Sequence, residues 1–350
     1  MYTQLYSWDN LLLAFHKAGR GKRGQPNVAA FEHRLEDNLF ALQDELLAFT
    51  YRPGPYDHFY VHEPKRRLIS AAPFRDRVVH HALCSQIEPL FERSFIADSY
   101  ANRLGKGTHR ALDRAQGFAR RYAYVLQCDV VQFFPSIDLE ILYGLLSRKL
   151  DDPGVLWLVQ RILEGGANLP AGETSPVYFP GDDLFAALRP TGLPIGNLTS
   201  QFWANVYLNP LDHFIKRELR CEGRSPAYLR FVDDILLFGN SKAWLWACKQ
   251  AIQERLARLR LVIHPGAQPR PVGQGFPFLG FVVYPWRRRL KRRKGLHYQR
   301  RLRFLLAACA RGDLPFEALN ASLRGWVEHA RHANTTGLRK AILGAACLKT

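Results

Sequence analysis

Three aspartates lie where apolar segments end, and carboxylates in such places are suited to metal-dependent chemistry. Asp233 and Asp234 stand between two apolar runs, a pattern that predicts a β-hairpin with two adjacent carboxylates at its tip. Asp129 follows the apolar segment 123–128, which predicts a strand. Adjacent carboxylates between buried strands repel each other, and a divalent cation removes that cost. A strand-borne aspartate beside an Asp-Asp hairpin is the arrangement that two-metal phosphoryl transfer requires.

Magnesium suits such a site, because it takes few carboxylates and completes its shell with water and substrate phosphates. Two ions would stand about 3.5–4 Å apart. We expect Asp129 and Asp233 to be the main ligands, with an added oxygen from the backbone carbonyl of Val130. Asp234 is the weaker candidate, because side chains alternate along a strand. A solvent-exposed turn is the competing interpretation of the Asp-Asp pair taken alone.

The elements that must position these carboxylates alternate between strand and helix in the middle of the chain. We expect an α+β fold with Asp129 on a central strand beside the hairpin and helices covering the back of the sheet. Apolar spacing predicts helices within 1–50, 73–87, 105–122, 138–164, 196–219, 241–259 and 298–348. Short β-prone segments predict further strands at 58–61, 261–263 and 278–284, and the Gly- and Pro-rich segment 165–192 predicts an irregular loop.

The charge balance points to a polyanionic partner. The chain has 350 residues and is 47% hydrophobic, which predicts two or three lobes rather than one compact domain. Its formal charge of +18 favours nucleic acid over membrane as the partner. Seven of the nine residues in 286–294 are cationic. We interpret this run as a phosphate-contacting face, with a solvated linker as the alternative.

The composition also indicates the cellular compartment in which the protein is expected. The six cysteines are scattered without a CxxC pair, which is typical of reduced thiols in a cytosolic protein. No apolar run approaches the roughly 20 residues of a membrane span. Residues 1–10 are polar, so we expect no signal peptide.

Several motifs resemble those of reverse transcriptases, in the same order and over nearly the whole chain. Residues 127–138, Gln-Cys-Asp-Val-Val-Gln-Phe-Phe-Pro-Ser-Ile-Asp, resemble the first catalytic motif of the family. Phe231-Val232-Asp233-Asp234 resembles its aromatic-x-Asp-Asp box, and 278–281, Phe-Leu-Gly-Phe, resembles the primer-gripping strand before the thumb.

The resemblance implies a right-hand polymerase with an antiparallel palm sheet backed by helices. We expect N-terminal helices and fingers at 1–122, a palm at 123–284 that includes a loop and motif at 165–200, and a small basic helical thumb at 285–350. It also implies RNA-templated addition of dNTPs to a primer 3′-end with two Mg²⁺ ions, and thus template RNA and primer or cDNA as partners.

The resemblance further implies residues that contact the incoming nucleotide. Phe134 matches the aromatic that excludes a 2′-hydroxyl, whereas Phe133 is expected in the core. Lys65 and Arg67 match the triphosphate-binding cations of the fingers best by position, with Arg75 close behind. Guanidinium groups suit phosphate oxygens, and a solvated basic loop is the alternative for any one of these residues.

The loop at 193–201 resembles that of one subclass of reverse transcriptases. Gly196 would let the backbone approach the nucleotide. Most reverse transcriptases have Gln before that Gly and Pro after the following Ser, whereas this chain has Ile195 and Gln201. That pattern resembles the error-prone polymerases of diversity-generating retroelements, in which a small basic helical accessory variability protein binds the polymerase. Ile195 cannot hydrogen-bond the nascent pair, although an ordinary apolar helix-entry residue is the plain alternative.

Two other regions complete the expectations. The segment 261–268 resembles a stretch that often carries a lysine that protonates pyrophosphate; this chain has none there, which leaves His264, Arg270 or another group. Trp326 is expected in the thumb core. The cations expected to contact nucleic acid are Arg288, Arg289, Arg292, Arg293, Arg300 and Arg301.

The expected role is error-prone cDNA synthesis in the cytoplasm of a bacterium. We expect the protein to be encoded by the bacterium or by its phage. A phage-defence or otherwise domesticated reverse transcriptase is the alternative among enzymes. A non-catalytic RNA-binding scaffold is the alternative outside them, and the intact Asp129, Asp233 and Asp234 argue against it.

Overall fold

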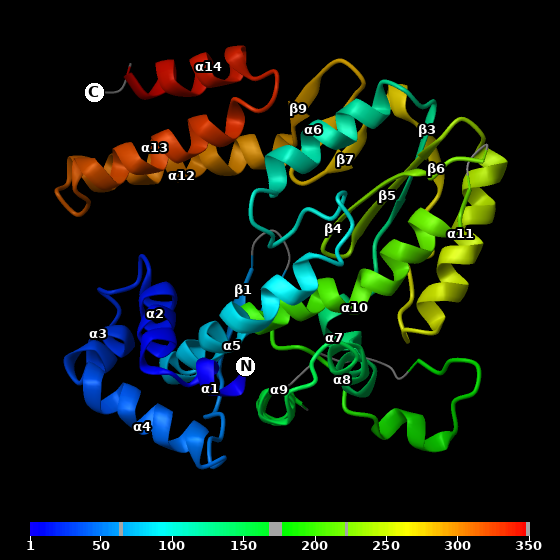
Figure 1. Ribbon diagram of the computed structural model, residues 1–350. Helices are drawn as coiled ribbons and strands as arrows, with labels where there is room; N and C mark the ends of the chain where they lie inside the picture. The colour runs from blue at the N-terminus through cyan, green and yellow to red at the C-terminus, as the bar shows by residue number, and fades with distance from the viewer. Residues whose placement is uncertain (63–65, 168–176, 221–222, 348–350) are drawn as a thin grey trace.

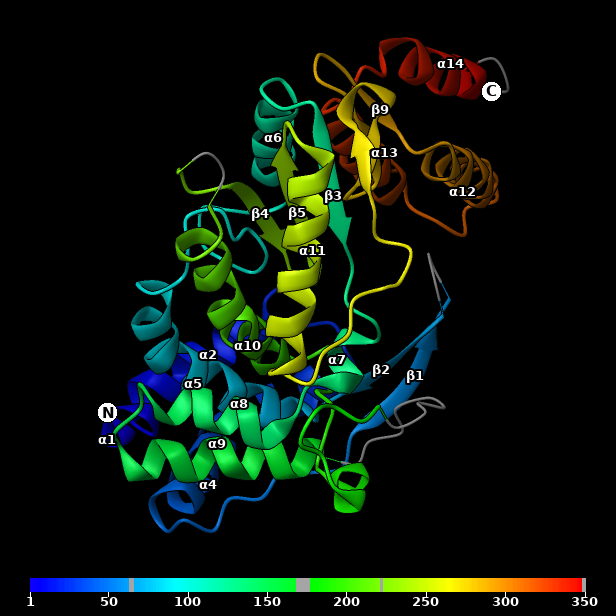
Figure 2. The ribbon, with the colours of Figure 1, turned by 90° about the vertical axis from the view of Figure 1, so that its right-hand side faces the viewer.

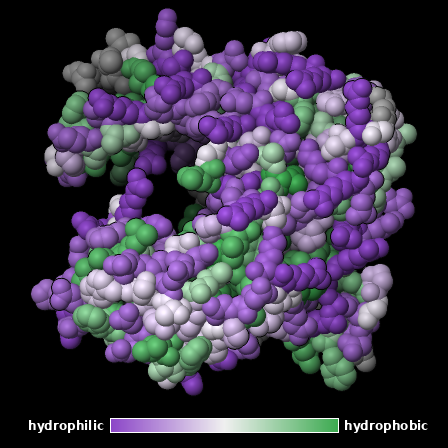
Figure 3. Space-filling model, in the orientation of Figure 1, coloured by the Kyte–Doolittle hydropathy of each residue, from purple (hydrophilic) through white to green (hydrophobic). Residues whose placement is uncertain are grey.

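The computed structural model describes residues 1–62, 66–167, 177–220 and 223–347. Figure 1 shows a sheet in the middle, N-terminal helices below it and C-terminal helices to its upper left. Figure 3 shows a hollow between the C-terminal and the N-terminal helices. We name the three parts the palm, the fingers and the thumb. In the described part of the chain, no helix combines the length and apolar character needed to cross a bilayer.

The palm sheet has four antiparallel strands in the order β4-β5-β3-β6. Its strands are β3 (Tyr124–Cys128), β4 (Ala227–Phe231), β5 (Asp234–Gly239) and β6 (Pro269–Pro271). The pairing of Cys128 with Ile235 puts the end of β3 beside the start of β5, as predicted. The expected strand at 261–263 is reduced to a single bridge between Val130 and Ile263, and β6 takes the sheet edge instead.

Helices cover both faces of this sheet, rather than its back alone, because the strands alternate between two apolar faces. Leu126 and Leu237 pack in the cluster that contains α10 (Leu198–Arg217) and α11 (Lys242–Ala257). Val125 and Phe238 pack on the other side with α6 (Thr108–Ala119). Figure 2 shows α11 in front of the strands.

The fingers combine a helical base with a hairpin. The hairpin pairs β1 (Asp57–Val61) with β2 (Arg67–Ala71). The helices predicted within 1–50 from apolar spacing are confirmed, and Phe31, Leu39 and Leu46 are buried. The helices of this base and of the adjoining palm are α1 (Tyr2–Leu5), α2 (Trp8–Gly19), α3 (Pro26–His33), α4 (Leu35–Leu47), α5 (Phe74–Glu92), α7 (Phe133–Ser136), α8 (Leu139–Ser147), α9 (Pro153–Gly166) and the 3₁₀ turn η1 (Leu184–Leu188).

The thumb begins with a small sheet that the sequence did not reveal. The expected strand at 278–284 is broken by a turn in which Leu279 has φ 44° and Gly280 has φ 89°. The basic run is not a linker, because it forms the third strand of this sheet and opens a helix. The elements are η2 (Val272–Gln274), β7 (Phe276–Phe278), β8 (Phe281–Val283), β9 (Arg288–Leu290), α12 (Arg292–Ala310), α13 (Phe316–Ala330) and α14 (Thr336–Cys347). Trp326 is buried and stacks on Tyr298 at 4.5 Å, so its prediction as a core residue is confirmed.

Candidate active site

Asp233 lies on a strained two-residue turn, and Asp234 is the first residue of the strand that follows it. Phe231 pairs directly with Asp234, so Val232 and Asp233 alone connect β4 to β5. Val232 has φ 56°, in the left-handed region that a β-branched side chain avoids. Such strain costs about 1–3 kcal/mol and persists only where the surrounding structure holds it.

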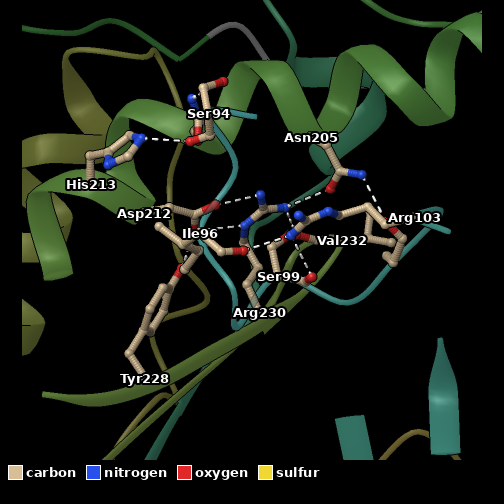
Figure 4. Close-up of polar contacts among 12 residues, drawn as sticks. Ser94, Ile96, Ser99, Arg103, Asn205, Asp212, His213, Tyr228, Arg230 and Val232 are labelled. Carbon is tan, nitrogen blue, oxygen red and sulfur yellow. Dashed lines mark hydrogen bonds and ion pairs between the residues drawn. The ribbon is translucent and has the colours of Figure 1, made fainter. Parts of the chain in front are cut away.

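A fully buried arginine holds this turn (Figure 4). Arg230 of β4 donates from Nη1 to the carbonyl oxygen of Val232 at 2.9 Å and to Oδ1 of Asn205 at 3.1 Å. Its Nε and Nη2 donate to the two oxygens of Asp212 on α10, at 2.8 and 2.7 Å. The hydroxyl of Tyr228 donates to the same carboxylate at 2.5 Å. The turn is thereby anchored to the helix behind the sheet.

Sequence reasoning missed this anchor. Burial opposes the charge of Arg230, but the adjacent Asp212 carboxylate outweighs it and keeps the arginine pKa above its ordinary value. The available signal was a single charged residue within the apolar strand 227–231. A buried charge requires a partner, and α10 supplies one.

Three carboxylates converge at the turn. Asp129 is exposed at the end of β3. Burial raises the pKa of Asp233, and the charge of Asp129 raises it further. Burial, with the charges of Asp233 and Asp129, raises the pKa of Asp234 to about 6. This mutual repulsion is what a bound cation would relieve.

The donor chemistry fits magnesium. The described residues contain no group of three or more His, Cys, Asp or Glu side chains that could hold a metal ion alone. Magnesium needs only one or two protein carboxylates when water and substrate phosphates complete its shell. Gln127 Nε2 donates to Asp234 Oδ1 at 3.4 Å, so this carboxylate has a protein partner in the sheet. Asp129 and Asp233 are therefore the better pair of ligands.

The carbonyl oxygen of Val130, next to Asp129, remains available as a metal ligand. Two hydrogen bonds form the bridge between Val130 and Ile263. The carbonyl of Asp129 accepts from His264 N at 2.8 Å, and the N–H of Val131 donates to the carbonyl of Val262 at 2.8 Å. The carbonyl of Val130 is not used by that bridge. Asp129, His264 and Arg270 also line one pocket of about 220 Å³.

The two phenylalanines after Asp129 lie in different environments. Phe133 is 3% exposed, whereas the adjacent Phe134 is half-buried, with the two rings edge-to-face at 5.4 Å. Leu193 N donates to Phe134 O at 2.9 Å, which places the 193–201 loop beside this ring.

That loop is also fastened to the fingers. The carbonyl of Ile195 accepts from Ser70 N at 2.9 Å. Gly196 has φ 120°, and a Cβ there would lie 2.9 Å from Ile69, so only glycine fits. Gln201 is exposed in the first turn of α10.

Asn197 was missed as the residue that fastens the loop. Its position before α10 is typical of a helix N-cap, but its side chain makes no capping bond. Its Oδ1 accepts from Ala72 N at 3.2 Å and its Nδ2 donates to Ser70 O at 3.1 Å, and the side chain is buried. It joins the fingers hairpin to the palm.

The cations of the fingers separate into two groups. Arg67 is exposed at the start of β2, and its charge lowers the pKa of Asp233, so it lies within electrostatic range of that carboxylate. Arg75 instead pairs with Glu45, and its guanidinium lies 5.3 Å from the Tyr51 ring. Its charge is thus neutralised against α4, which counts against the predicted phosphate contact. Lys65 lies outside the described residues.

The thumb cations also fall into two groups, one paired with a carboxylate and the other exposed to solvent. Arg288 is buried and pairs with Asp113 of α6 at 2.6 Å, which counts against its predicted place on an exposed phosphate-contacting face. The next residue in β9 points the opposite way, as strand alternation requires. The other predicted cations are exposed: Arg289, Arg292, Arg293, Arg300 and Arg301.

Comparison with known proteins identifies the family of this chain. The family model described as reverse transcriptase (RNA-dependent DNA polymerase) matches residues 62–268. Protein YkfC of Escherichia coli is 25% identical over 292 residues, 73% of each chain. The group II intron-encoded protein LtrA of Lactococcus lactis is 26% identical over 202 residues, 56% of this chain but only 30% of LtrA. The structure of apo telomerase from Candida tropicalis aligns with a TM-score of 0.47 and 9% identity over 67% of this chain and 48% of that one. Since the family model spans more than half of the chain, and the fold is the right-hand arrangement of palm, fingers and thumb, this protein belongs to the reverse transcriptase family of RNA-dependent DNA polymerases.

Proposed function

We propose that this protein extends a primer 3′-end with dNTPs on an RNA template, with Asp129 and Asp233 as the metal-binding carboxylates. The convergence of the two on the anchored, strained turn carries this proposal. When bound, two magnesium ions supply activation of the 3′-hydroxyl and charge balance for the leaving pyrophosphate. The Val130 carbonyl adds a ligand, and Asp234 supports the site from the sheet.

The remaining residues bind and select the nucleotide. Arg67 contacts the triphosphate, because it is the described fingers cation whose charge reaches Asp233. The half-buried ring of Phe134 fills the space that a 2′-hydroxyl would need, whereas Phe133 belongs to the core. Gly196 and Ile195 line the nascent pair, with Gln201 at the start of the following helix. The exposed cations of α12 bind the template–primer backbone.

We further propose error-prone cDNA synthesis for a diversity-generating retroelement, in a bacterial cytoplasm and with a small accessory protein as partner. The pair Ile195 and Gln201 supports this role. The likeness to a group II intron-encoded protein supports a second candidate, an intron-related reverse transcriptase, although the match spans only 30% of that protein. Domesticated and phage-defence roles share the same chemistry.

Sequencing of cDNA made on one RNA template separates these roles. A mutagenic enzyme should misincorporate opposite adenine far more than opposite other bases. Ile195→Gln adds a hydrogen-bonding group and should lower those errors, about tenfold for each 1.4 kcal/mol of added discrimination. Leu104→Gln, at a residue that is 98% exposed, is the matched control. Uniformly low errors with the natural RNA and any accessory protein present would favour the intron-related or defence role.

A further inference from the structure

A polar pocket of about 310 Å³ lies where palm helix α6 meets the thumb. Its polar lining includes Gln116, Arg287, Arg288, Arg331, His332 and Asn334, and we call it the junction pocket. It contains three guanidinium groups but no carboxylate side chain in its lining. This composition suits an anion.

The junction pocket lies at the far end of the thumb sheet from the β4–β5 turn that carries Asp233, which we call the catalytic turn. Lys291, just after β9, donates its backbone N–H to Gly280 O at 3.1 Å, and its charge lowers the pKa of Asp234. That end of β9 therefore faces the active site. Arg288 begins β9 at the other end, where the connection from β8 packs on α6. The junction pocket is thus separate from the catalytic carboxylates.

Hydrogen bonds from three elements fix its walls. Arg288 and Asn334 exchange two bonds of 2.9 Å, from Arg288 N to Asn334 Oδ1 and from Asn334 N to Arg288 O. Gln116 Nε2 of α6 donates to Tyr284 O at 3.0 Å. The thumb loop after α13, the β8–β9 connection and α6 are therefore held together around the junction pocket.

The arginines keep unused donors. The side chain of Arg288 is only 10% exposed, and its Nε has no hydrogen-bond partner although its Nη2 pairs with Asp113. Arg331 pairs with Glu328 through Nη2 at 2.9 Å, and its side chain is 57% exposed. Arg287 stacks on Tyr284 and has no carboxylate partner in the described part of the chain. A buried donor without a partner is costly, and phosphate oxygens would satisfy it.

An exposed aromatic ring stands at the rim. Trp286 is 78% exposed, which is unusual for so large an apolar side chain. The guanidinium of Arg120 lies 5.0 Å from its ring centre and is fixed by a 2.9 Å bond from Nε to Pro285 O. Proteins bind single-stranded nucleic acid with such pairs of stacking rings and cations.

We propose that the junction pocket binds a nucleotide of single-stranded RNA, with the phosphate among the arginines and the base on Trp286. The site would hold part of the RNA outside the template–primer path, since it lies at the opposite end of β9 from the catalytic turn. The choice of RNA rests on the proposed function, whereas the anion and ring sites rest on the geometry alone.

Binding of a fluorescein-labelled oligouridine to the full chain tests this proposal. Trp286→Ala should weaken binding about tenfold, the loss expected for one stacked base. Arg331→Gln should reduce the slope of log affinity against log salt by about 0.7, the value for one phosphate contact on a single strand. Trp246→Ala is the matched control, because Trp246 is 47% exposed and stacks under Lys249 but lies on α11. It should change neither quantity.

The outcomes separate this proposal from the polymerase activity. Trp286→Ala should extend a preannealed primer on RNA at the wild-type rate. Unchanged oligouridine affinity in Trp286→Ala, or an equal loss in Trp246→Ala, would overturn the site while leaving primer extension unaffected. An extension rate that falls with the affinity would place Trp286 in the template–primer path and also overturn it. If the wild type fails to extend any primer while Trp286→Ala still loses affinity, the polymerase proposal fails and the junction pocket stands.

Discussion

Removal of the buried guanidinium that anchors the β4–β5 turn should reduce both stability and activity. Arg230→Met leaves the carboxylate of Asp212 buried without its cation and the carbonyl of Val232 without its donor. Loss of one partner of a buried ion pair costs about 3–5 kcal/mol. We expect the free energy of unfolding to fall by that amount. The turn, no longer held, should relax from the φ of 56° at Val232 and carry Asp233 with it.

A double variant distinguishes positioning from stability. Arg230→Met with Asp212→Asn removes both charges, so much of the stability should return. Val232 would still lack its donor, and primer extension should stay reduced about 100-fold, as expected for a displacement of about 1 Å at a reacting centre. Arg114→Met is the control, because its partner Asp98 keeps an ion pair with Lys216 at 3.1 Å.

Denaturant unfolding and single-nucleotide extension at saturating magnesium measure the two effects. A double variant that regains both stability and wild-type extension would refute the positioning role of Arg230. A single variant as stable as the wild type would refute the energetic argument.

Three further predictions concern the sugar, the backbone and pH. Phe134→Ala should raise ribonucleotide use in rNTP–dNTP competition, because it opens space for a 2′-hydroxyl; unchanged discrimination would move the gate elsewhere. Arg292→Gln with Arg293→Gln should weaken binding to template–primer and flatten its salt dependence, and an unchanged slope would show that these exposed cations make no phosphate contact. Burial lowers the pKa of His80 to about 3, so only the unfolded chain takes up a proton as pH falls below about 6.5. The stability that neutral His80 contributes should therefore be full above about pH 6.5 and fall by about 2 kcal/mol by pH 5. In urea titrations, His80→Leu should reduce the loss of stability over this range, whereas His33→Leu at the surface should not.

The palm could be predicted from the sequence because short, contiguous segments indicate its strands and the turn between them. Asp129 and the hairpin carboxylates follow short apolar segments whose lengths fit strands, and the register follows from the two-residue turn. The anchor could not be predicted, because Asp212 lies on a helix eighteen residues before Arg230 and meets it only through tertiary packing. The strain at Val232 is likewise invisible to propensity, since a valine is an ordinary strand residue.

The thumb was predicted less well, for two reasons. The turn that splits β7 from β8 requires a positive φ at Leu279, a conformation that its residue type opposes. Strand β9 was not predicted, because it lies within the basic run, where the many charged residues leave no apolar alternation to indicate a strand. Once β9 is known, alternation explains why Arg288 is buried and Arg289 is exposed.

Asp233 is proposed to bind the metal rather than to contact the template or to stabilise the fold. Asp233→Asn relieves repulsion from Asp129, so the fold should be no less stable than the wild type. Single-nucleotide extension with magnesium on a preannealed primer–RNA template is the direct measurement, with Asp151→Asn at an exposed position as the control. We predict that Asp233→Asn loses extension while it binds RNA with nearly wild-type affinity and that Asp151→Asn retains both. Extension by Asp233→Asn at close to the wild-type rate would contradict the proposed active site.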